Sequence, residues 1–164
     1  INTVLNENTS LIVASSGNAG TNIANYPAAF EGVVSVTSTS EGSVFSCWAT
    51  RHETVDIAAP GDNVFTTTTS PNEGGFYYNY ATGTSFSAPI LSGALGLLKS
   101  IYPDGDNTFL ISKIKDNANY YNDMDGNCNG ENLNGLVGTG ELNIREAIIN
   151  PTPISLAVSS INVL

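Results

Sequence analysis

Three short apolar runs constrain the fold of this chain more than any other feature. They are SLIVAS at residues 10–15, GVVSVTST at 32–39 and VDIAAPG at 55–61. Runs that are rich in β-branched and small residues, without strict alternation of apolar and polar positions, are typical of strands buried on both faces. Because helical segments follow them along the chain, the pattern predicts an α/β fold with a mainly parallel sheet that is covered on both sides.

Further strands and one long helix follow. Residues 64–70 and 76–81 are expected to be strands, joined by a turn rich in Pro, Asn and Gly. Residues 85–101 are apolar on nearly every side, so the sequence predicts a helix that is buried all round. Gly93 and Gly96 would let this helix approach the sheet closely.

Two shorter helices are predicted near the carboxyl end. The first covers residues 108–118, with Asp106 or Asn107 as its N-cap, and the second covers 144–149.

Length and composition indicate one packed domain or part of one, over residues 1–150. The chain begins without a methionine and close to the middle of a strand, as a piece cut from a longer polypeptide would. Residues 151–164 open with Pro-Thr-Pro and become strand-like, which is typical of a linker or the start of a further β element. Cys47 and Cys128 could form one disulfide or remain free, and both alternatives stay open.

Composition also argues against two classes of partner. Hydrophobic residues make up 41% of the 164 residues and charged residues 12%, which suits a globular protein rather than a disordered one. Fifteen acidic residues against five basic ones give a net charge of -10, and such a surface repels phosphate backbones and anionic lipids. Nucleic acid and membranes are therefore not expected as partners, and no apolar run reaches the length of a bilayer span.

A serine stands at the predicted start of the long helix, in the string Gly83-Thr84-Ser85-x-Ser87-x-Pro89. A serine hydroxyl becomes an effective nucleophile only when a neighbouring base takes its proton. In the first turn of a helix, backbone N–H groups and the positive end of the dipole point to the place where an oxyanion would form. Gly83 would let a substrate backbone come near. The alternative is that Ser85 or Thr84 only caps the helix.

This string resembles the nucleophile motif of subtilisin-like serine proteases, which reads Gly-Thr-Ser, any residue, a small residue, any residue, Pro. SLIVASSGNAG (10–20) is similar to the strand of that family that ends in Gly-Asn, and VDIAAPG to its strand that ends in Ala-Pro-Gly. VGTGELNIREAI (137–148) is similar to the stretch before the last helix of the family. The order and spacing agree from about residue 10 to residue 149. The resemblance implies a three-layer subtilisin-like fold, of which this chain holds the later part.

The resemblance also implies a role for several residues. Ser85 would be the nucleophile, and Asn18 and the Ser85 backbone N–H would hold the oxyanion. The ordinary interpretation of an Asn after Gly at a strand end is a turn residue. The substrate-binding candidates are Ser15, Ser16 and Gly17, along one wall of the pocket for the residue before the scissile bond, with Gly83 and Thr84.

The base and the acid of the triad are not found in this chain. In a subtilisin-like triad Asp and His precede Ser, and in this family both also precede the oxyanion Asn. They are therefore expected upstream of residue 1. His52 follows Asn18 and lacks the family's His-Gly-Thr context, so it is not assigned as the base. Asp56 and Asp62 are interpreted as solvated carboxylates at a strand edge or turn.

The segment DMDGNCNGENLNG (123–135) is a candidate calcium loop. Oxygen-bearing side chains recur there with a following glycine, but the twelfth position is Leu136 rather than Glu, and such runs are common in ordinary turns. A structural calcium ion and a turn both remain open. The candidate ligands are Asp123, Asp125, Asn127 and Asn129.

The predicted function is endopeptidase cleavage of protein or peptide substrates through an acyl-enzyme at Ser85, by a secreted or cell-surface protein. The chemistry needs no cofactor. Without its base the chain alone should be inactive, since triad members act as a unit. Its partner would be the upstream half of the same catalytic domain, as a separate chain after processing or as a part missing from a truncated polypeptide. The main alternative is a non-catalytic structural or binding module on the same fold. A lipase-like hydrolase is disfavoured, because Ser87 takes the place of the second glycine in Gly-x-Ser-x-Gly.

Overall fold

The computed structural model describes residues 10–69, 76–120, 128 and 130–150. Its main sheet consists of β1 (Ile12–Ser15), β2 (Val33–Ser40), β3 (Val44–Phe45) and β4 (Ile57–Pro60). The strands β1, β2 and β4 are parallel and lie in that order across the sheet, and the short β3 pairs antiparallel with β2. The predicted α/β class with a mainly parallel sheet is confirmed.

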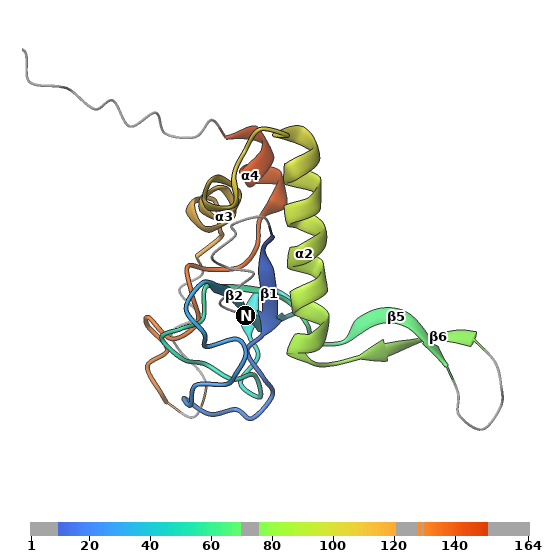
Figure 1. The fold of residues 1–164 in the computed structure, drawn as a ribbon. Helices are drawn as coiled ribbons and strands as arrows, with labels where there is room; N and C mark the ends of the chain where they lie inside the picture. Colours follow the sequence, from blue (N-terminus) through green and yellow to red (C-terminus); the bar gives the residue numbers. More distant parts are fainter. Residues whose placement is uncertain (1–9, 70–75, 121–127, 129, 151–164) are drawn as a thin grey trace, which may run out of the picture.

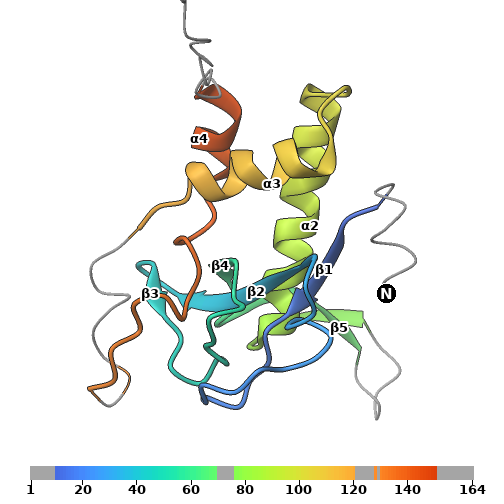
Figure 2. The ribbon, with the colours of Figure 1, turned by 60° about the vertical axis from the view of Figure 1, so that its left-hand side comes forward.

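Three helices and a hairpin complete the described chain. They are α2 (Thr84–Ile101), α3 (Asn107–Asp116), α4 (Ile144–Ile149), β5 (Val64–Thr69) and β6 (Phe76–Ala81). The antiparallel pair β5–β6 projects from the body beside the first turn of α2 (Figure 1). Figure 2 shows β1, β2 and β4 crossing below α3 and α4. The turn predicted between β5 and β6, and residues 151–164, lie outside the described residues.

Side-chain caps fix the starts of the two shorter helices. The Asp106 carboxylate accepts a hydrogen bond from the Phe109 N–H at 2.7 Å, which confirms Asp106 as the N-cap of α3. At α4 the Asn143 side chain accepts from the Glu146 N–H at 3.1 Å. The start of α2 has no such cap, because Gly83 precedes its first residue.

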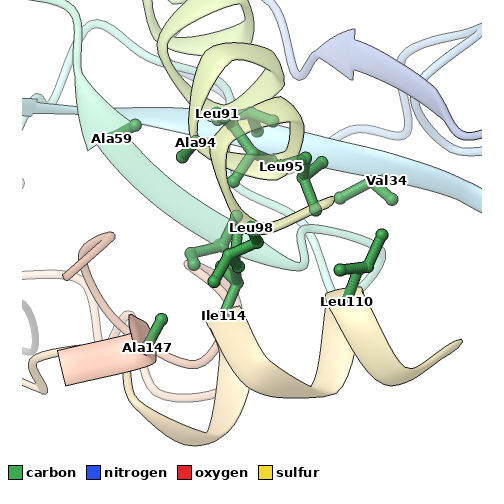
Figure 3. Packing of buried hydrophobic residues seen from close by; sticks show 11 residues of the cluster. Val34, Ala59, Leu91, Ala94, Leu95, Leu98, Leu110, Ile114 and Ala147 are labelled. Carbon is green, nitrogen blue, oxygen red and sulfur yellow. The ribbon is translucent and has the colours of Figure 1, made fainter. Parts of the chain in front are cut away.

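The main core lies between the sheet and the helices (Figure 3). Side chains from β2 and β4 meet one side of α2, and α3 and α4 close the far end. Its buried members are Val34, Val36, Ile57, Ala59, Leu91, Ala94, Leu95, Leu98, Leu110, Ile114 and Ala147.

The long helix α2 is buried on one side only. Ile90, Leu97 and Ile101 are 37%, 47% and 42% exposed, and a Cβ atom added at Gly93 or Gly96 would meet nothing within 4 Å. The prediction that this helix is buried all round, with its glycines against the sheet, is therefore wrong for the described part of the chain. A sheet can cover only one side of a helix, and the glycines lie on the other.

Loops cover the opposite face of the sheet. Phe45, Ala49, Ala58, Leu133 and Val137 form a second buried cluster there, which includes Cys128.

A disulfide joins Cys47 to Cys128, which answers the question that the sequence left open. The Arg51 guanidinium lies close by, and it binds the Glu131 carboxylate and donates to the Gly20 carbonyl at 2.9 Å. Segments 47–51 and 128–131 are thus joined both covalently and by an ion pair.

Candidate active site

Ser85 is the second residue of α2 and its side chain is exposed. The first N–H groups of a helix have no acceptor within the helix. Here the Thr84 N–H donates to Asn18 and the Phe86 N–H to the Gly83 carbonyl, so among the described contacts the Ser85 N–H is the one left for a bound anion. Pro89 has no N–H to donate to the Ser85 carbonyl, which leaves that carbonyl without its usual helical partner. The serine therefore stands at a polar, accessible helix end, as the motif predicts.

Asn18 reaches the same helix end from the loop that follows β1. Its Oδ1 accepts hydrogen bonds from the Thr84 N–H at 3.0 Å and from the Thr84 hydroxyl at 2.8 Å. A backbone N–H can only donate, so the amide atom that faces Thr84 must be the oxygen. The Nδ2 group is consequently directed away from Thr84, with its two protons free of this contact.

Gly83 lies next to both the Ser85 hydroxyl and the Asn18 amide. A Cβ atom at this position would lie 3.0 Å from the Ser85 Oγ and 3.5 Å from the Asn18 Nδ2. Both atoms thus face one small volume, which any side chain at position 83 would enter. A hydroxyl nucleophile and an amide donor next to one open volume can attack a carbonyl carbon and stabilise the oxyanion that results.

The loop before Asn18 is held from the interior. Ser16 is buried and its hydroxyl donates to the Thr50 carbonyl at 2.9 Å, while the Asn25 Nδ2 donates to the Ser16 carbonyl at 3.0 Å. Gly17 has a φ of 108°, and a Cβ atom there would lie 2.5 Å from the Asn25 Nδ2. In the predicted pocket wall, Ser16 and Gly17 therefore offer their main chain rather than a side chain.

Thr50 supports this loop, and sequence analysis missed it. Its N–H donates to the Gly17 carbonyl at 2.7 Å, and its hydroxyl accepts from the Ala19 N–H at 3.3 Å. Its carbonyl accepts from the hydroxyls of Ser16 and, at 3.0 Å, Thr37. A lone threonine between predicted elements carries no signal of such a position, because every one of these contacts is made across the fold.

The residues that were set aside as triad members make other contacts. The Nδ1 of His52 pairs with the Thr54 hydroxyl at 3.0 Å, within a turn whose backbone also bonds to Leu136. Asp56 binds the Lys115 ammonium at 2.7 Å and the Ser35 N–H at 2.9 Å. Its interpretation as a solvated carboxylate is wrong, because it ties β2 to α3.

Asp62 is also more than a solvated turn residue. One of its carboxylate oxygens accepts from the Ser40 hydroxyl and the other from the Thr82 hydroxyl, both at 2.8 Å. The carboxylate therefore bridges the end of β2 to the segment just before Gly83.

The calcium candidates Asp123, Asp125, Asn127 and Asn129 lie outside the described residues. Within the part of the chain that is described, no group of three or more His, Cys, Asp or Glu side chains is placed to hold a metal ion. None of the described helices is long and apolar enough to cross a membrane.

The chain belongs to the subtilase family, whose family model matches residues 1–140. The halolysin-like extracellular serine protease Nep of Natrialba magadii is 32% identical over 108 residues, which are 66% of this chain and 19% of that protein. The major intracellular serine protease of Bacillus subtilis is 39% identical over 95 residues, 55% of this chain and 28% of that protein. A solved protease from Pseudoalteromonas arctica superimposes with a TM-score of 0.75 at 26% identity, covering 90% of this chain and 44% of that one.

These likenesses confirm the subtilisin-like fold and the family that the motifs indicate. The chain spans less than half of each of these three proteins.

Proposed function

We propose that the chain provides the nucleophile Ser85 and the oxyanion donor Asn18 of a serine endopeptidase. The observation that supports this proposal best is the position of the Ser85 Oγ and the Asn18 Nδ2 beside the same volume at Gly83. The contacts from Thr84 that turn the Asn18 Nδ2 outward would be unnecessary for a serine that only capped a helix.

The reaction would proceed in two steps. The Ser85 Oγ attacks the carbonyl carbon of the peptide bond while a base takes its proton, and the oxyanion forms beside the Asn18 Nδ2 and the Ser85 N–H. The C–N bond then breaks, the amine leaves with the proton, and an ester remains on Ser85. Water attacks this ester, and the acid product leaves as the hydroxyl of Ser85 is restored.

The base and its orienting Asp would come from a segment upstream of residue 1, so this chain alone should be inactive. The uncovered side of α2, with Leu97 and Ile101, suits an additional protein layer, because contiguous exposed apolar surface is uncommon on soluble domains.

The edge strand β1 offers that segment a second place to dock. Among the described strands β1 pairs only with β2, so its other edge is open. A groove of about 420 Å³ runs beside this edge, between Ile12 and Val13 of β1 and Leu95 of α2. The elements β1 and α2 lie side by side (Figure 1), so one upstream segment could extend the sheet and cover the helix together.

We also propose that the enzyme is secreted or displayed at the cell surface. The Cys47–Cys128 disulfide supports this, since disulfides persist mainly in oxidising compartments. One of the named relatives is extracellular and another is intracellular. The expected substrate is a protein or peptide, no cofactor takes part in the chemistry, and structural calcium at 123–129 remains a proposal.

Labelling with a fluorophosphonate tests the proposal. The full-length protein that contains this segment is treated with the probe, digested and mapped by mass spectrometry, with Ser85→Ala as the control. We expect the probe's mass on the peptide that carries Ser85, and its loss in the variant. If folded full-length protein leaves Ser85 unlabelled, the enzyme proposal is wrong and a non-catalytic module on the same fold takes its place.

A further inference from the structure

A cavity of about 570 Å³ opens at the carboxyl ends of β2 and β4, next to the start of the β5–β6 hairpin. Three of the residues that line it are acidic, namely Glu41, Asp62 and Glu141. Among its described lining residues there is no Lys, Arg or His. The cavity therefore presents negative charge without an internal cation to balance it.

Glu141 is the least expected member of this lining. Its side chain is only 8% exposed, and its Oε1 accepts a hydrogen bond from the Thr39 hydroxyl at 3.0 Å. Its Oε2 is buried and has no hydrogen-bond partner among the described residues. A buried carboxylate oxygen without a partner is costly, and a rotation of the carboxylate toward the cavity that lets it accept from a bound donor would remove that cost.

The remaining lining suits an organic cation better than a metal ion. The described acidic groups do not converge in the manner of a metal site. Val64, Tyr80 and Ile90 provide an apolar part of the wall, against which the methylene stem of a long basic side chain can pack. An arginine or lysine side chain needs both an apolar channel and an acidic end, and this cavity has both.

The cavity wall is hydrogen-bonded to the segment just before the proposed nucleophile. The Asp62 carboxylate accepts from the Thr82 hydroxyl at 2.8 Å, and the Gly61 carbonyl accepts from the Gly83 N–H at 2.8 Å. The wall that carries Asp62 is therefore bonded directly to the two residues that precede Thr84 and Ser85.

The order of the strands indicates on which side of the cleaved bond the cavity lies. Residues 15–17 and Asn18 follow β1, whereas the cavity lies at the ends of β2 and β4, on the other side in the order β1-β2-β4. If the residue before the scissile bond lies against 15–17, the chain beyond that bond runs toward the cavity.

We propose that this cavity binds a basic side chain of the substrate, an arginine or a lysine, on the C-terminal side of the cleaved bond. The inference rests on the function proposed above. The Glu141 carboxylate would turn its unpartnered Oε2 toward the cavity and accept a hydrogen bond from the cation, while Asp62 and Glu41 add negative charge at the cavity wall. The enzyme would thus prefer peptides with a positive charge in the leaving segment.

Pairs of peptides that differ only in the charge of one side chain test the preference of the full-length protein for a basic residue. Quenched fluorescent peptides carry arginine or its neutral analogue citrulline at each of the first three positions after the cleaved bond. We expect kcat/KM to be about 10- to 100-fold higher for arginine at one of these positions, as for a buried hydrogen bond to a charged group. Equal values for arginine and citrulline at all three positions would overturn the inference.

Glu141→Gln is the decisive variant, because glutamine keeps an oxygen for the Thr39 hydroxyl and loses the charge. We expect it to lower the arginine-to-citrulline ratio more than any other single variant of the cavity. Glu31→Gln, an exposed residue before the opposite end of β2, is the matched control and should keep the ratio. Glu41→Gln at an exposed position should lower the ratio by a smaller factor, and it decides the matter if Glu141→Gln does not fold.

A binding measurement separates this inference from the proposed catalysis. Calorimetry with full-length Ser85→Ala should show tighter binding of the arginine peptide than of the citrulline peptide, and Glu141→Gln in that background should abolish the difference. If no peptide is cleaved but this difference is found, the proposed function fails and the cavity assignment stands. If peptides are cleaved and arginine binds no better than citrulline, only the cavity assignment fails.

Discussion

Thr84 should act on catalysis through Asn18, and Thr84→Val tests this. The threonine hydroxyl donates to the Asn18 Oδ1 at 2.8 Å and accepts from the Gly17 N–H at 3.2 Å, at a site that is 1% exposed. Valine has the same shape and makes neither bond. Leaving a buried partner unsatisfied costs about 1–3 kcal/mol of folding stability.

The effect on rate has an upper limit. In subtilisin, a member of this family, removal of an oxyanion donor lowers kcat by about 10²–10³. Thr84→Val keeps the bond from the Thr84 N–H to Asn18, so we expect a smaller loss, about tenfold in kcat. KM should change little, because the Asn18 Nδ2 meets its negative charge only as the oxyanion develops.

Steady-state kinetics of the full-length protease with Thr84→Val, Thr84→Ser, Asn18→Ala and the double variant Asn18→Ala/Thr84→Val provide the test. Serine keeps the hydroxyl and should be close to wild type. In the Asn18→Ala background, Thr84→Val should have almost no further effect on kcat. A full additional tenfold loss in the double variant, or a Thr84→Ser variant as slow as Thr84→Val, would refute the reasoning.

The remaining predictions concern stability. Replacing Cys47 and Cys128 by serine removes a cross-link between residues that are 81 apart in the sequence. The chain-entropy model predicts that the free energy of unfolding, measured by urea denaturation, falls by about 4.5 kcal/mol. A loss below about 1 kcal/mol would contradict that model for this disulfide. A hydrogen bond from Arg51 holds the pKa of Glu131 below its usual 4.5, so the pair stabilises the fold above that pH and the contribution is lost as pH falls through the lower folded value. Melting temperatures of wild type and Glu131→Gln should therefore differ at neutral pH and converge in acid, and a gap that widens in acid would be the contrary result. Leu98→Ala empties a fully buried position and should cost about 2–5 kcal/mol in the same urea assay, where a cost below 1 kcal/mol would place Leu98 outside the core.

The sequence predicted the features that short stretches of the chain determine by themselves, such as the N-cap of α3 and the buried strands. The cap at Asp106 is a contact within one turn, and the apolar runs that become β1, β2 and β4 need burial on both faces, so their sequence alone indicates a parallel sheet. The motif at 83–89 and the pair Gly17-Asn18 could be identified because the residues of each are close together in the sequence.

Contacts between distant segments could not be predicted in this way. Thr50 holds the Ser16–Gly17 loop, but nothing in its neighbourhood along the chain distinguishes it from a loop threonine. The uncovered side of α2 was missed for a different reason. The sequence shows which side chains of α2 are apolar and can be buried. Which of them this part of the chain does bury depends on the position of the sheet, and that is a property of the fold.

The disulfide decides what a proteolytic cut does to the proposed site. Ser85 lies between Cys47 and Cys128, so these cysteines close a covalent ring that contains the proposed nucleophile. A single cut inside the ring, for example in the projecting β5–β6 hairpin, leaves both fragments attached and migrating as one species until a reductant is added.

Asn18 lies outside that ring. A cut between Asn18 and Cys47 would leave the proposed oxyanion donor joined to Ser85 only by non-covalent contacts, such as the hydrogen bonds from Thr84 to Asn18 and from Thr50 to Gly17 and the packing of β1. Proteolysis at these two places therefore has different outcomes. The first yields a nicked molecule that keeps its pieces together, and the second allows the donor and the nucleophile to part.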